Sequence, residues 1–117
     1  MPLPTYNPDE ILEALQRADY KFVLEKAMSH AVAGNADAQC VIALLFEAGL
    51  GVKRNVVEAE YWLRKSAKRN SALGWHNLGT LYAAKHPELK SRWDQAQECW
   101  KKAAELGFDR GYPYPPR

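Results

Sequence analysis

A repeat within the sequence constrains the fold more than any other feature. When the chain is aligned with itself at an offset of 36 residues, Ala43 falls on Gly79 and Phe46 falls on Tyr82. Past the next loop the offset becomes 37, and the matched pairs are Ala59 with Ala96, Trp62 with Cys99, and Leu63 with Trp100. A period in the mid-thirties is typical of helical solenoids. The sequence therefore predicts stacked helical hairpins, each of which buries its apolar faces against its neighbours.

Apolar residues follow helical spacing through most of the chain, and no window alternates with the period of two expected for strands. Within 36–48, for example, Ala38, Ile42, Leu45 and Phe46 share one helical face. Glycine, proline and capping residues separate six such segments. We therefore expect six helices: one capped by Asp9, one from Asp19 to about Gly34, one over 36–48, one from Asn55 to Asn70, one from Ser71 to His86, and one from about Ser91 to Gly107.

The residue types at the repeated positions indicate how these helices pack. Small residues such as Ala43 and Ala59 recur where two helices must approach closely, and aromatic residues such as Trp100 recur where a wedge between hairpins must be filled. The last helix is expected to turn Trp93, Trp100 and Ala104 toward the core. The pattern predicts an all-α fold, a right-handed α/α superhelix (solenoid) of about three helical hairpins.

We expect one domain over residues 1–117, divided by its helix-ending residues and prolines. Its segments are an extended lead-in 1–8, a degenerate N-terminal capping hairpin 9–33, repeat one 34–69, repeat two 70–107, and a proline-rich tail 108–117. In the capping hairpin, Lys26 occupies the position of Trp62, which suits a terminal unit whose outer face meets water. Two interpretations of the tail stay open: it is a polyproline-type ligand for another domain, or it is disordered or covers the end of the last helix.

The two repeats carry the motifs of a known class. Residues 75–82 match the W-x-x-L-G-x-x-Y signature of the tetratricopeptide repeat, and Ala96 and Trp100 match its later A-x-x-x-F pair with Trp for Phe. The first unit has a longer loop with Gly-x-Gly-Val at 49–52, followed by Ala-x-x-Trp-Leu-x-Lys-Ser-Ala at 59–67. This combination resembles the Sel-one-like (Sel1-like) repeat, the longer-looped relative of the tetratricopeptide repeat. The second unit departs from the pattern in its loop, because residues 85–91 lack the Gly-x-Gly.

The resemblance implies a concave groove lined by the first helix of each hairpin. The partner-binding positions would be Asp37, Cys40, Leu44 and Glu47 in the first unit, and Leu73, His76, Thr80 and Ala83 in the second. Steps of three and four residues place each set on one stripe of its helix. For Leu44 and Val41, packing against the N-terminal helices is the other interpretation. For His76, it is a solvated side chain.

Composition and charge exclude several classes of partner. The net charge is +2, from 16 basic and 14 acidic residues that are interspersed, so no footprint for nucleic acid or anionic lipid stands out. The longest strongly apolar run, 41–46, is too short to span a bilayer, so we expect no membrane interaction. Residues 1–10 lack the basic and apolar regions of a secretory signal. Cys40 and Cys99 lie among apolar neighbours, which favours two reduced thiols in a cytoplasmic protein.

The sequence carries no pattern typical of a catalytic or metal centre. The three histidines, His30, His76 and His86, lack the spacing of a helical metal site, so we expect no metal and no cofactor. The conspicuous Trp62 and Trp75 fall at wedge positions, which favours a core role. No Ser-x-x-Lys or Gly-x-Ser-x-Gly motif is present, and we therefore expect that the protein is not an enzyme.

These patterns lead to a hypothesis of non-catalytic protein–protein interaction. By analogy with the resembled family, the chain would act as an adaptor that binds one protein partner through the groove and modulates it. A narrower hypothesis is a bacterial immunity or inhibitor protein. Two alternatives stay open: a small hydrolase-like Sel-one-repeat enzyme, and a structural homo-oligomer built by end-to-end stacking. We expect a monomer or a weak homo-oligomer.

Overall fold

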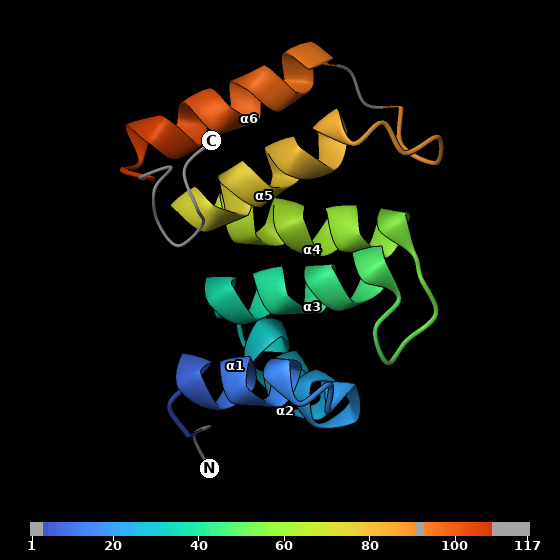
Figure 1. The fold of residues 1–117 in the computed structure, drawn as a ribbon. Coiled ribbons are helices and arrows are strands. Elements are labelled where there is room, and N and C mark those ends of the chain that lie inside the picture. Colours follow the sequence, from blue (N-terminus) through green and yellow to red (C-terminus); the bar gives the residue numbers. More distant parts are fainter. Residues whose placement is uncertain (1–3, 91–92, 109–117) are drawn as a thin grey trace.

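The chain folds into a stack of α helices. The structure, a computed structural model, describes residues 4–90 and 93–108. Its helices are α1 (Pro8–Gln16), α2 (Tyr20–Val32), α3 (Ala36–Ala48), α4 (Val56–Lys68), α5 (Ala72–Ala83) and α6 (Trp93–Glu105), and these residues contain no strand. Each helix packs on the next, and α5 also packs on α3, so the stack runs from α1 and α2 at one end to α6 at the other (Figure 1). The predicted all-α helical-repeat solenoid is confirmed.

Side-chain caps begin all five helices whose preceding residue is described. The prediction that Asp9 caps the first helix is wrong. The Asn7 side chain accepts hydrogen bonds from the backbone N–H groups of Asp9 and Glu10 instead, at 3.1 and 3.2 Å. Pro8 therefore takes the first helical position, where its missing N–H leaves no bond unmade. The other four caps are Asp19, Asn35, Asn55 and Ser71.

The loop between α3 and α4 turns through two left-handed glycines. Gly49 has φ +69° and ends α3, and Gly51 has φ +73°. A Cβ atom on Gly51 would lie 2.7 Å from the Cβ of Tyr20, so the glycine also permits the loop to approach α2. The loop is closed by a 2.8 Å hydrogen bond from the N–H of Asn55 to the carbonyl of Phe46.

Close helix contacts are made at small residues, as the repeat predicts. Ala43 and Ala59 are fully buried. A Cβ atom on Gly74 would lie 2.4 Å from the Ser66 hydroxyl oxygen, and one on Gly79 would lie 2.7 Å from the Trp100 ring. The Trp100 indole N–H donates to the carbonyl of His76 at 3.2 Å, which holds that ring against α5. The helix spacing therefore depends on these small side chains.

The prediction for α6 is wrong in part. Ala96, Cys99 and Ala103 are buried, but Trp93 is 57% exposed and Ala104 is also exposed. Trp100 is half-buried and packs edge-on against Trp93 with ring centroids 5.6 Å apart. The physical reason is that, among the described residues, α6 packs only on α5. The predicted start of this helix at Ser91, and the tail beyond Phe108, lie outside the described residues.

The Gly79→Ala substitution tests the close contact between α5 and α6. Alanine is favoured over glycine in a helix by about 1 kcal/mol. Here the added methyl meets Trp100 and the carbonyl of Ala96, and such overpacking costs about 1–3 kcal/mol. We expect the melting temperature, measured by circular dichroism, to fall by a few degrees. Thr80→Ala, at the exposed neighbouring position, is the control, and a rise in the melting temperature of the Gly79→Ala variant would contradict the account.

Candidate partner-binding cleft

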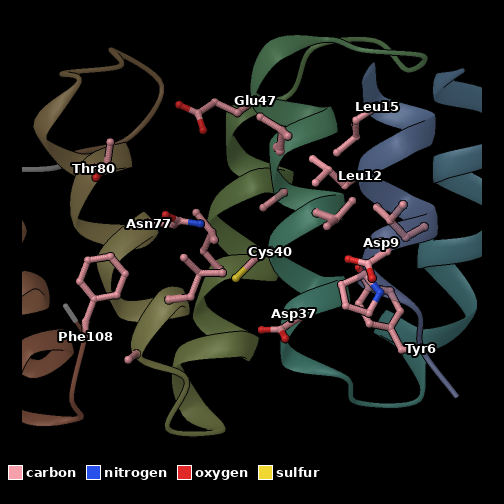
Figure 2. A pocket seen from close by; sticks show the side chains of 18 of the residues that line it. Tyr6, Asp9, Leu12, Leu15, Asp37, Cys40, Glu47, Asn77, Thr80 and Phe108 are labelled. Atoms are coloured by element: carbon pink, nitrogen blue, oxygen red, sulfur yellow. The ribbon is translucent and has the colours of Figure 1, made fainter. Parts of the chain in front are cut away.

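A cleft lies across α1, α3 and α5 (Figure 2). Its volume is about 1130 Å³. Most of its lining is apolar, with Ile11, Leu12 and Leu15 from α1, Val41 and Leu44 from α3, and Leu73 from α5. The described lining also includes Phe108, which follows α6. The cleft is therefore formed by the first helices of successive hairpins, and Gly107 and Phe108 border it on the α5 side.

Six of the eight predicted groove residues line this cleft. They are Asp37, Cys40, Leu44, Glu47, Leu73 and Thr80. The other two, His76 and Ala83, are not among its lining residues. The role of all eight residues in partner binding stays a prediction. The six lining residues share one surface, and His76 and Ala83 lie outside its lining.

His76 lies at the end of the stack rather than in the cleft. Its ring stacks on Phe108, with centroids 4.2 Å apart and an interplanar angle of 13°. In the repeat alignment His76 falls on Cys40, which is buried and lies 3.3 Å from the Ser66 hydroxyl oxygen. In the first repeat this position therefore lies against α4. In the second repeat the His76 ring lies against Phe108, which follows α6, and burial lowers the pKa of His76.

The wall contributed by α1 was missed by sequence reasoning. The apolar stripe of the first helix is wider than the core needs, because Ile11 and Ala14 are buried whereas Leu12 is 53% exposed. Val41 is half-buried and packs on the core, and Leu44 remains 43% exposed. The adjacent apolar pair Ile11 and Leu12 could have revealed this wall. Neighbouring residues of a helix point in different directions, so a helix that packs on the core with one face buries only one of the two.

The cleft carries negative charge. Its described lining contains Asp9, Asp37 and Glu47 but no Lys, Arg or His. Burial, with the nearby Asp37 carboxylate, raises the pKa of Tyr6 to about 12, so this lining phenol stays protonated at neutral pH. Glu47 lies 3.6 Å from the imidazole of His86, which stands outside the lining.

The thiols do not have the properties of catalytic nucleophiles. Cys40 and Cys99 are both free and buried. Burial raises the pKa of Cys40 to about 11 and raises that of Cys99 as well, so both are protonated at neutral pH. Across residues 4–90 and 93–108, no group of three or more His, Cys, Asp or Glu side chains could hold a metal ion. In the same residues no helix is both long and apolar enough to cross a membrane.

The stacked hairpins and their concave cleft define an α-helical repeat protein of the solenoid class. Residues 36–71 and 94–108 match the family model of the Sel1 repeat. The crystal structure of a Sel1 repeat protein from Oxalobacter formigenes is also similar, with a TM-score of 0.75 and 27% sequence identity over 87% of the chain. The chain is a Sel1-like repeat protein, as its motifs predict.

The chain spans 42% of the length of the Oxalobacter formigenes protein. No curated protein matches the chain. Sel1 repeats are generally protein–protein interaction modules.

Burial of His76 predicts a pH dependence of stability. The pKa of His76 is lower in the folded protein than its ordinary value of 6.5, so the unfolded chain binds this proton more readily. This difference lowers the free energy of unfolding as the pH falls. The loss of stability is absent above pH 6.5 and is complete below the pKa that His76 has in the folded protein. Melting temperatures between pH 8 and pH 5, on about a one-unit grid, should fall less for His76→Gln than for the wild type. Parallel curves would contradict the burial of this imidazole.

The raised pKa of Cys40 predicts a slow thiol. At pH 8, a pKa of about 11 in place of 9.0 lowers its thiolate fraction by about a hundredfold. Reaction of the folded Cys99→Ala variant with a chromogenic disulfide reagent should be slower than that of the denatured variant by at least this factor. A folded Cys40 that reacts as fast as a free thiol would reopen the case for a cysteine nucleophile.

Proposed function

We propose that the chain is a non-catalytic module that binds one protein partner in the cleft across α1, α3 and α5. The observation that carries this proposal is the exposure of Leu12 and Leu44, from two different helices, in one continuous apolar cleft. Exposed apolar surface of this kind is costly in water unless something covers it. The general interaction role of Sel1 repeats supports the same function.

The proposed consequence of binding is modulation of the partner. The cleft joins residues of α1, α3 and α5 in one continuous surface, which supports one partner rather than a multi-component scaffold. Such a chain would serve as an immunity or inhibitor protein if the captured partner is a toxin or an enzyme. The two free thiols support a reducing, cytoplasmic setting.

A second candidate function is self-association at the end of the stack. Trp93 is exposed at the beginning of α6 and packs on Trp100, and α6 is the last described helix, on which another hairpin would stack in a longer array. Light scattering at several protein concentrations separates this candidate from a monomeric adaptor. A mass that grows with concentration and returns to that of one chain in Trp93→Glu would favour it.

The Leu44→Glu substitution tests the proposed function. A carboxylate in the cleft would have to be desolvated by any partner that covers Leu44, so capture should be lost or fall by at least about tenfold. Val57→Glu is the matched control, because Val57 is 55% exposed on α4 and does not line the cleft. The measurement is affinity capture from the lysate of the source organism, read by quantitative mass spectrometry.

The pattern across the two variants decides the outcome. A stoichiometric partner retained by wild type and Val57→Glu but lost by Leu44→Glu supports binding in the cleft. Equal retention by all three proteins would place the interface elsewhere and contradict the proposal. Circular dichroism of each variant confirms that the fold is intact before the comparison is made.

A further inference from the structure

The charges of the cleft are segregated from those of the rest of the chain. The chain as a whole has 16 basic and 14 acidic residues, with a net charge of +2. The described lining of the cleft has three carboxylates and no cationic side chain. No described Lys or Arg forms an ion pair with Asp9, Asp37 or Glu47. The carboxylates of this apolar surface are therefore available to an incoming cation.

Two of these carboxylates mark the ends of the cleft. Asp37 lies in the first turn of α3 and Glu47 in its last turn. Ten residues separate them, which corresponds to about 15 Å along a helix. Figure 2 shows Asp37 near one end of α3 and Glu47 near the other, with Cys40 between them, and Asp9, Leu12 and Leu15 on the α1 side of the cleft. The cleft thus has an apolar centre with a negative charge at each end.

Helix electrostatics accounts for only part of this arrangement. Asp9 and Asp37 each lie in the first turn of a helix, where the dipole stabilises a carboxylate. Glu47 lies in the last turn of α3, where the same dipole destabilises it. Its described neighbour, His86, is 3.6 Å away and carries a positive charge only when protonated. A cation supplied from outside the chain would offset the unfavourable position of Glu47.

From this geometry we infer that the partner presents a basic, apolar segment. The segment carries two or more large apolar side chains, which cover Leu12 and Leu44, and Lys or Arg side chains about 15 Å apart, which pair with Asp37 and Glu47. That separation corresponds to about ten residues of a helix or about four to five residues of an extended strand. The inference rests on the proposed function and specifies the chemistry of its partner.

A peptide selection on the full chain tests this inference. The probe is a displayed library of random peptides of about 16 residues, long enough for either spacing. Peptides retained by the wild type and rejected by Leu44→Glu are then synthesised, and their affinities are measured by fluorescence anisotropy. The key variant is Asp37→Asn with Glu47→Gln, which removes both charges and nearly preserves shape. Glu58→Gln with Glu60→Gln, on α4 outside the lining, is the control.

The expected peptides are apolar and net positive. Their affinity should fall by about tenfold in Asp37→Asn/Glu47→Gln, fall with added salt, and stay unchanged in the α4 control. Selected peptides that are acidic or uncharged, or bind both variants equally, would overturn the inference. The absence of any cleft-dependent peptide would also overturn it.

Other occupants of the cleft give distinct results. Peptide binding that requires removal of residues 109–117 would assign the cleft to the chain's own C-terminal segment, and self-association abolished by Leu44→Glu would assign it to a second copy. Either result overturns the inference. If the lysate experiment shows a partner that depends on Leu44 but contacts the cleft with an acidic segment, only the inference fails. If capture does not depend on Leu44, the proposed function fails.

Discussion

The close approach of α5 to its neighbours is the constraint on which the rest of the structure depends. Gly74 lies against Ser66 of α4, and Gly79 lies against the Trp100 ring of α6, at distances that leave no room for a methyl group. The Ser66 hydroxyl also donates to the carbonyl of Ala36 at 3.0 Å, which ties α4 to the beginning of α3. Because each hairpin is stabilised mainly by its neighbours, these contacts fix the spacing of the whole stack.

That spacing produces the cleft. The first helix of each hairpin lies on the same face of the stack. The residues that these helices leave exposed on that face therefore form one stripe rather than scattered patches. In this chain the stripe has an apolar centre, where Leu12 and Leu44 are exposed, and carboxylates at its ends. Apolar area contributes most of the free energy of association, and complementary charge favours the right partner and register. The apolar centre of the cleft therefore favours association in general, and its carboxylates favour a partner that carries positive charge.

Much of the fold could be predicted from the sequence because matched positions in the two repeats have the same packing role. The period predicted the small residues at Ala43 and Gly79 and the bounds of α3. The errors occur where the repeat has no further copy. Trp93 is exposed because α6 has no described neighbour beyond α5, and His76 stacks on Phe108, the last described residue. The repeat offset compares positions within the sequence, so it does not predict how residues at an end of the stack are covered.

The binding surface itself was less predictable than the fold. Six of the predicted groove positions lie in one cleft, but the contribution of α1 depends on how that helix packs on α2, which the repeat does not encode. The acidic character of the cleft depends on three carboxylates from two helices distant in sequence. Charge counted along the chain averages them with the basic residues of the outer surface, and the segregation emerges only in three dimensions.

Methyl-resolved nuclear magnetic resonance of the leucine-labelled chain, titrated with its captured partner, tests the central claim most directly. The account predicts that the methyl signals of Leu12, Leu44 and Leu73, which line the cleft, shift or broaden in proportion to bound partner. Leu106, which is exposed outside the cleft, should remain unchanged. Shifts confined to Leu106 and other residues outside the lining would contradict binding in the cleft.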